Sequence, residues 1–289
     1  MVMQIGSPVY MLSLFIAFVL LTGLFFLLKG RRKGVQKGIL LGLMLLNVLQ
    51  HLLKFLIYPH CYGNGFNVEN TAYNMCAFLI LLAPIAYGTR SAFLRDFTFY
   101  TATVAGILAI AVPIWFLGQP VKSLSWEYLR FYLCHVLLFL SGALPLMLGH
   151  HKPSWRCFPK IGLAFLLVLG LILLNDALCV LAGIFPGHTA QDLYATLRAI
   201  NPCWSMGPPA DGSFAFVVDV IHLFSPNIFC GENAAGLYIP LLWYAIPMYL
   251  GITLVAFGVC TLVDRRRFLQ DMRLLRARRK KRARDRKKG

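Results

Sequence analysis

Two residues that can cooperate in nucleophilic catalysis occur in apolar stretches of this sequence. Cys76 comes four residues after Ala72, near the start of one stretch, and His135 comes eight residues after Glu127 in another. A thiolate is the reactive form of cysteine, and hydrocarbon disfavours the thiolate, so the thiol needs a nearby base. An imidazole at a similar depth supplies one. Cys76 and His135 are therefore a candidate nucleophile and general base.

Other polar residues fall at a similar distance from one end of their own apolar stretches. At 1.5 Å per helical residue, the group lies roughly 5–15 Å from the boundary. Polar side chains are costly in hydrocarbon, so they usually face other helices and mark functional sites. An amide from this layer can stabilise an oxyanion, and its carboxylate can orient an imidazole. The supporting layer consists of Asn47, His51, Asn74, Asn175 and Asp176.

Each of these residues also has a purely structural interpretation. A single cysteine in a span usually packs, a single histidine usually bonds a carbonyl group, and Asn or Asp can tie helices together. Lys54, near a helix end, is expected to extend its amine to the interface. Cys134, Cys179 and Cys260 have apolar neighbours and are expected to be packing residues. Because the cysteines lack metal-binding spacing, we expect no metal and no cofactor.

Composition defines the class of protein. The 289 residues are 58% hydrophobic and 13% charged, with a formal net charge of +17. The mean hydropathy is +0.68, far above that of a soluble domain. Residues 264–289 hold 14 of the 28 basic residues but three of the 11 acidic ones. These values exclude a soluble enzyme, a secreted disulfide scaffold and a disordered chain, and they predict a membrane-spanning body with a short cationic tail.

Apolar runs that can cross roughly 30 Å of hydrocarbon recur between residues 1 and 263. They predict an all-α polytopic membrane protein with about seven transmembrane helices. The first run lacks a basic leading segment and a cleavage site, so it is expected to be a span rather than a signal peptide. The predicted spans are 9–28, 38–58, 72–88, 97–117, 127–148, 161–184 and 237–263.

The distribution of basic residues predicts the orientation. The first, third and fifth loops and the tail are basic, whereas residues 60–71 contain no Lys or Arg and the long loop 185–236 contains Arg198 alone. Cations next to spans stay in the cytoplasm. We therefore expect the N-terminus outside, the C-terminus in the cytoplasm and the polar layer in the outer leaflet. The protein is expected in the cytoplasmic membrane if its source is bacterial.

The loop 185–236 is long for a connector and is interrupted by prolines. Leu193, Leu197 and Ile200 recur at helical spacing and predict a short interfacial helix, and residues 214–224 are a candidate for a second. Cys61, Cys203 and Cys230 fall in segments expected outside. One disulfide among them, most simply Cys203–Cys230, and three free thiols both remain open.

Two stretches resemble a known family. Residues 74–84, beginning Asn74-Met75-Cys76 and ending at Pro84, resemble the third-span motif of the bacterial YwaF-type integral membrane proteins, whose animal relative is transmembrane protein 164. Residues 132–135 (Tyr-Leu-Cys-His) resemble the histidine helix of that family, 59 residues after Cys76. The resemblance covers residues 72–148 best and agrees with a seven-span layout.

The resemblance implies a membrane-embedded cysteine acyltransferase that moves a fatty acyl chain between glycerophospholipids. Cys76 is then the nucleophile and His135 the base. Bacterial members typically have His-x-Cys after a proline, whereas this chain has Asn74 and no preceding proline. His51 is a candidate to replace the missing imidazole.

Two other functions remain open from the sequence. A transporter or channel can use Asn47, His51, His135 and Asp176 as a polar pathway, and a non-catalytic scaffold needs them only to hold helices together. Phospholipids are the expected substrates, and the tail is expected to contact anionic lipid headgroups rather than nucleic acid.

Overall fold

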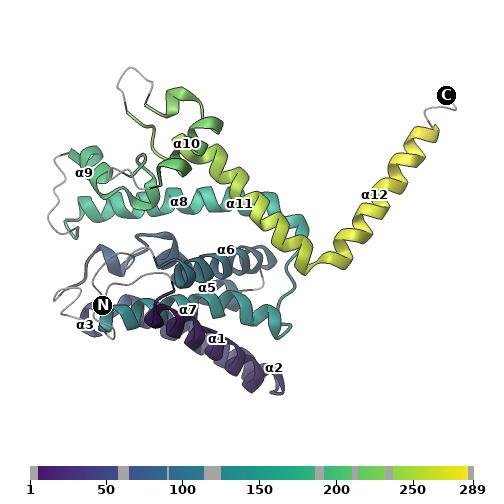
Figure 1. The fold of residues 1–289 in the computed structure, drawn as a ribbon, viewed down its shortest axis with the longest axis horizontal. Helices are drawn as coiled ribbons and strands as arrows, with labels where there is room; N and C mark the ends of the chain where they lie inside the picture. Colours follow the sequence, from purple (N-terminus) through teal and green to yellow (C-terminus); the bar gives the residue numbers. More distant parts are fainter. Residues whose placement is uncertain are drawn as a thin grey trace.

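The computed structural model describes residues 6–57, 65–89, 91–113, 125–185, 192–209, 214–231 and 237–285, with residues 127 and 279–285 described by their backbone alone. Within this part of the chain, seven helices are long and apolar enough to cross a membrane. The predicted all-α multi-spanning fold is therefore confirmed (Figure 1).

The seven spanning helices begin and end near the predicted boundaries. The largest differences are at three helices. Helix α2 begins five residues before position 38 and ends at Leu52, where a short helix α3 (Lys54–Ile57) follows. Helix α6 begins five residues before position 97, and α11 begins five residues after position 237. Positions 58 and 114–117 of the predicted spans lie outside the described residues. The helices are α1 (Pro8–Lys29), α2 (Lys33–Leu52), α5 (Met75–Gly88, preceded by the short helix η1, Val68–Asn70), α6 (Ala92–Ala111), α7 (Trp126–Met147), α8 (Phe158–Leu181) and α11 (Leu242–Val263).

Polar caps define where several of these helices begin. The side chains of Ser7, Ser91 and Ser125 accept hydrogen bonds from first-turn backbone N–H groups of α1, α6 and α7. Such caps satisfy donors that have no partner within the helix. The cap at Ser91 explains why α6 starts earlier than hydropathy alone predicts.

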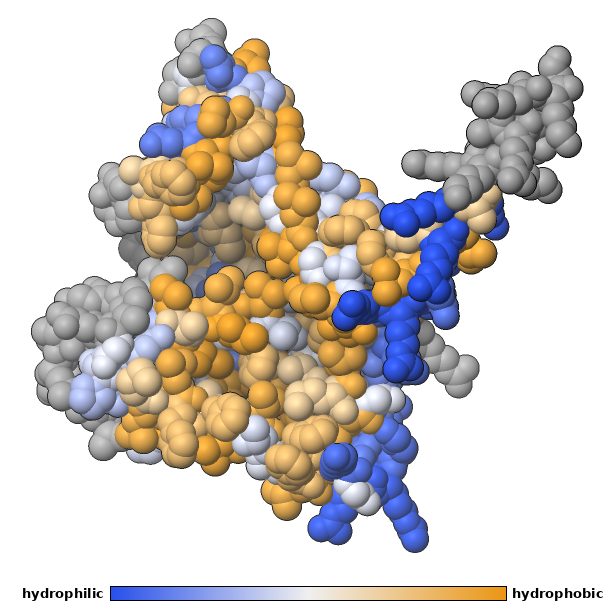
Figure 2. Space-filling model, turned by 45° about the vertical axis from the view of Figure 1, so that its right-hand side comes forward, coloured by the Kyte–Doolittle hydropathy of each residue, from blue (hydrophilic) through white to orange (hydrophobic). Residues whose placement is uncertain are grey.

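The spans form two groups (Figure 1). Helices α1, α2, α5 and α6 pack around α7, while α8 packs mainly against α11. Contacts of α8 with α5 and α6 join the two groups, and Figure 2 shows the surface hollowed between them.

Glycines permit the closest helix contacts. A methyl group at Gly142 of α7 would lie 2.9 Å from the backbone nitrogen of Thr103 in α6, and one at Gly162 of α8 would lie 2.8 Å from the ring of Tyr249 in α11. Small residues of this kind let membrane helices approach closely.

The long connector before α11 contains the two predicted short helices, α9 (Leu193–Ile200) and α10 (Ala215–Phe224). Leu197 of α9 is buried, and α10 buries Ile221 while Phe216 and Leu223 stay exposed. No disulfide joins Cys203 to Cys230. Cys61 lies outside the described residues.

The basic tail begins as a helix, α12 (Arg265–Asp285), which turns away from α11 (Figure 1). Asp271 accepts hydrogen bonds from Arg156 at 2.7 and 2.9 Å and from the indole of Trp155 at 2.9 Å. The ring of Phe268 packs edge-on against Trp155. These contacts dock the first turns of α12 on the start of α8. Basic side chains of α12 gather at this end of an otherwise largely apolar surface (Figure 2).

Replacing Asp271 tests this docking. Asp271→Ala removes the acceptor shared by Arg156 and Trp155, so we expect faster hydrogen–deuterium exchange in residues 265–275 and little change in global stability, because solvent screens surface ion pairs. Gln270→Ala changes an exposed neighbour on the same helix and should leave exchange unaltered. Equal exchange in both variants would show that Asp271 does not hold α12.

Candidate functional site

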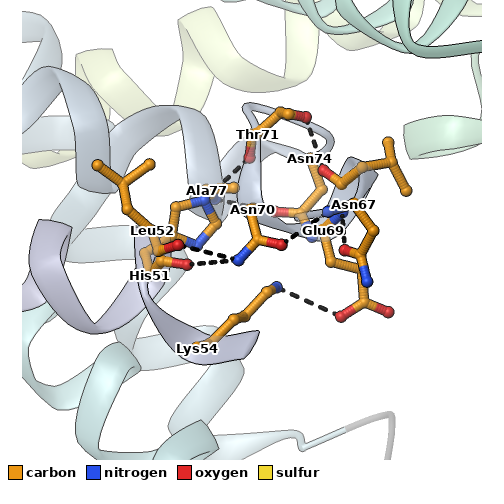
Figure 3. Close-up of polar contacts among 10 residues, drawn as sticks. His51, Leu52, Lys54, Asn67, Glu69, Asn70, Thr71, Asn74 and Ala77 are labelled. Atoms are coloured by element: carbon orange, nitrogen blue, oxygen red, sulfur yellow. Dashed lines mark hydrogen bonds and ion pairs between the residues drawn. The ribbon is translucent and has the colours of Figure 1, made fainter. Parts of the chain in front are cut away.

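The loop 67–74 leads into α5 and is tied to the end of α2 (Figure 3). Asn67 and Asn70 close a reciprocal capping box around η1. The fully buried Asn70 also donates from Nδ2 to the carbonyl oxygens of Leu52 at 3.1 Å and His51 at 3.4 Å. Because carbonyl groups in the last turn of a helix have no intrahelical donor, Asn70 satisfies the end of α2 while it holds the loop.

Thr71 connects this loop to two spanning helices. Its carbonyl oxygen accepts a hydrogen bond from His51 Nε2 of α2 at 2.9 Å. Its hydroxyl oxygen accepts from Asn175 Nδ2 of α8 at 2.8 Å and donates to the carbonyl of Val68 at 2.6 Å. His51 and Asn175 thus position the loop. The observed contact of His51 is with the loop, at the Thr71 carbonyl group.

Asn74 caps α5 and places Cys76 in the first turn of that helix. The side-chain oxygen of Asn74 accepts from Ala77 N at 2.9 Å. Cys76 is the second helical residue and is half-buried. The positive end of the helix dipole favours negative charge at this position, whether on a thiolate or on an oxyanion. The observed role of Asn74 is therefore to cap the helix through its side-chain oxygen.

His135 lies on α7, buried beside Cys76. Its Nδ1 is 2.7 Å from the carbonyl oxygen of Phe131. Because a carbonyl only accepts, Nδ1 carries the proton and Nε2 is the basic nitrogen. The thiol of Cys76, on the neighbouring helix α5, is near enough to interact with this imidazole. The structure thus brings together the two residues that the sequence separates by 59 positions.

Two neighbours support this imidazole. Cys134, expected to be a packing residue, also places its sulfur 3.3 Å from His135 Nδ1. Asn47 of α2 donates to the carbonyl oxygen of Cys134 at 3.1 Å and accepts from Gln50 at 2.6 Å. Asn47 therefore fixes α2 against α7 directly beside the imidazole, as a positioning residue.

Asp176 is the carboxylate of the predicted polar layer, and its observed partner is an amide rather than an imidazole. Asp176 is 1% exposed and accepts a hydrogen bond from Asn175 at 3.0 Å. The Nδ1 atom of His135 is oriented by the Phe131 carbonyl group, so Asp176 does not orient that imidazole. Asp176 instead supports the amide that holds Thr71.

Lys54 is fully buried, with Nζ 3.3 Å from Glu69 and 5.2 Å from the ring centroid of Tyr73. The expectation that its amine extends to the interface is therefore wrong. The ion pair draws Lys54 inward, against the loop that precedes α5 (Figure 3).

Three site residues were missed in the sequence: Asn70, Thr71 and Cys203. The Asn67-x-x-Asn70 spacing before an apolar run is a capping signal that can reveal the first. Cys203 packs against Met75 and Cys76 from a loop more than 120 positions away, and its spacing gives no indication of this contact.

Among the described residues, no group of three or more His, Cys, Asp or Glu side chains is arranged to hold a metal ion. The chemical groups at the site are the thiol, the imidazole and the first turn of α5.

Fold and site together define a polytopic membrane protein with a thiol–imidazole pair between its helices. The model of the TMEM164 family matches residues 5–181, more than half of the chain, and the chain belongs to that family. The match includes Cys76, His135 and their partners on α2 and α8, and it ends with α8. It supports the relation to transmembrane protein 164 and does not test the YwaF-type assignment. A search of curated proteins and a search of solved structures each found no match.

The role of Asn70 can be tested by stability. Asn70→Ala leaves two terminal carbonyl groups of α2 without this donor, so we expect a loss of about 1–3 kcal/mol and a lower melting temperature in detergent. Thr22→Ala is the control, because the exposed Thr22 hydroxyl bonds carbonyl groups of its own helix. Equal melting temperatures for the two variants would contradict the assigned role.

Proposed function

We propose that this protein is a membrane-embedded acyltransferase that acts on glycerophospholipids through a thioester on Cys76. The observation that carries the proposal is the Cys76–His135 pair, in which the Phe131 carbonyl group leaves Nε2 of the imidazole as the base. Membership of the TMEM164 family supports an integral membrane protein in which such a lipid-directed site is expected.

The proposed reaction has two steps. His135 Nε2 takes the thiol proton, and Cys76 Sγ attacks the ester carbonyl of a phospholipid. The C–O bond breaks, the lysolipid oxygen receives the proton from His135, and an acyl thioester remains on Cys76. The same imidazole then deprotonates an acceptor hydroxyl, which attacks the thioester and releases the thiol.

The start of α5 can stabilise the oxyanion in both steps. Backbone N–H groups in the first turn of a helix point away from it and favour negative charge. Preorganised donors of this kind typically supply a large part of catalysis by acyl transfer. The hydrogen bonds from His51, Asn70 and Asn175 keep this turn in place relative to α7.

The depth of the pair suits an ester substrate. The ester groups of a phospholipid lie at the boundary between headgroups and acyl chains, and Cys76 stands at the start of its spanning helix rather than at its centre. The hollow between the two helix groups (Figure 2) is the proposed route for a lipid to reach the site.

A transport pathway is the less favoured function. Asn47, His51 and Asn175 each bond a neighbouring element. Side chains committed to holding helices and a loop are poorly placed to exchange partners with a passing ion. Flux through liposomes that persists in Cys76→Ala would favour transport.

The decisive variants are Cys76→Ala and His135→Gln, assayed with purified protein and phospholipids that carry a labelled acyl chain. We expect Cys76→Ala to lower acyl transfer by roughly a thousandfold or more and His135→Gln by about a hundredfold or more.

Cys230→Ala is the matched control, because Cys230 is also a half-buried cysteine but lies outside the pair. It should retain activity, and all variants should elute as the wild type does on size exclusion. Full activity in Cys76→Ala would refute the proposal.

We also propose that α12 contacts anionic lipid headgroups. Leu275 continues the helix face of Phe268 and Met272 and is exposed, and 11 of the 21 residues of α12 are basic. A dye attached to Leu275→Cys should shift to the blue when phosphatidylglycerol is added to phosphatidylcholine nanodiscs, with the dye on Thr22→Cys as the control. An unchanged spectrum would contradict this contact.

A further inference from the structure

A second thiol lies against the first turn of α5. Cys203 packs together with Met75 and Cys76 in one cluster of apolar side chains. Cys203 and Met75, the residue before Cys76, also pack against a second cluster of buried side chains that contains Trp243 and Tyr244. Two thiols, one from α5 and one from the loop after α9, thus belong to the same apolar cluster.

The loop that carries Cys203 has an unusual backbone. Asn201, Cys203 and Trp204 have φ values of 44°, 50° and 59°, in the left-handed region that non-glycine residues seldom adopt. Such a conformation is unfavourable and persists only where the surroundings impose it.

Hydrogen bonds from two sides impose this conformation. Within the loop, Asn201 donates to the carbonyl of Gly207 at 2.9 Å and accepts from Met206 N at 2.9 Å. From α11, Trp243 Nε1 donates to the carbonyl of Trp204 at 2.8 Å, and Tyr244 Oη donates to that of Cys203 at 3.3 Å. Hydrogen bonds within the loop and from α11 thus hold Cys203 in this unusual backbone conformation.

We propose that Cys203 is the resolving thiol of Cys76 and that a peroxide converts the two into a reversible disulfide that switches the site off. The pairing rests on the cluster geometry alone. The loss of acyl transfer that it causes rests on the function proposed above.

The chemistry balances with hydrogen peroxide as the two-electron oxidant. The Cys76 thiolate attacks one peroxide oxygen, the S–O bond forms, the O–O bond breaks, and the departing hydroxide takes a proton to become water. Cys203 Sγ then attacks the sulfenic sulfur of Cys76, the S–S bond forms, and the hydroxyl group leaves as a second water with the proton of Cys203. A thiol reductant reverses the reaction.

The environments of the two thiols set the order of these steps. Burial raises the pKa of Cys203 to about 11, so this thiol is protonated at neutral pH and reacts slowly with peroxide. Cys76 has the imidazole beside it and reacts first. Cys203 reacts afterwards, when the sulfenic acid lies next to it.

The test uses the full chain in nanodiscs, treated with hydrogen peroxide, blocked with an alkylating agent, digested and analysed by mass spectrometry. We expect a cross-linked peptide pair that contains Cys76 and Cys203, formed within one chain and lost on addition of dithiothreitol. Cys203→Ser, which keeps a hydrogen-bonding group at this position, should lose the cross-link and accumulate a Cys76 sulfenic acid that dimedone traps.

Two control variants make the result specific. Cys134→Ala, which removes the other thiol beside His135, and Cys230→Ala should both keep the cross-link. A cross-link from Cys76 to Cys134 instead, or sulfenic acid on Cys76 of the wild type that never resolves, would overturn the pairing.

Activity measured in parallel separates this inference from the proposed function. The wild type should lose acyl transfer on oxidation and regain it on reduction, and Cys203→Ser should not regain it once Cys76 is overoxidised. Cross-linking in a protein that never transfers acyl chains would refute the proposed function and leave the pairing intact. Cross-linking without loss of acyl transfer would refute the switch.

Discussion

The position of Cys76 depends on the hydrogen bonds that hold the loop 67–74 between α2 and α8. Asn70 and His51 connect this loop to the end of α2, and Asn175 connects it to α8 through Thr71. Since α5 begins where the loop ends, these bonds decide where its first turn lies relative to α7. Together with the packing of α5 and α7 on α6, this junction positions the thiol and the imidazole.

The low dielectric of a bilayer explains why such a junction is specific. A buried amide or imidazole without a partner costs several times what a satisfied hydrogen bond contributes, so arrangements that break the network are strongly disfavoured. In this layer Asn47, His51, Asn70, Asn175 and Asp176 each have a hydrogen-bond partner on another residue. The polar groups needed to align the helices also surround the reactive thiol, so alignment and the proposed catalysis are properties of one network.

Much of the fold was predictable from the sequence, because hydropathy alone identifies segments that can span a bilayer. The depth of polar residues along those spans also predicted that Cys76 and His135 lie at one level. Their detailed roles were not predictable. Asn74 serves as a helix cap, and Lys54 turns inward to Glu69, because loop geometry and not helical periodicity decides these contacts. The approach of Cys203 depends on three left-handed residues that composition does not signal.

The central claim is that Cys76 carries an acyl group during turnover. Intact-protein mass spectrometry after brief incubation with a phospholipid of defined acyl chains, without an acceptor, tests it most directly. The account predicts one adduct of the mass of that acyl chain, which is removed by neutral hydroxylamine as expected of a thioester and is absent in Cys76→Ala. An adduct that persists in Cys76→Ala, or the absence of any adduct while the wild-type protein still transfers acyl chains, would contradict it.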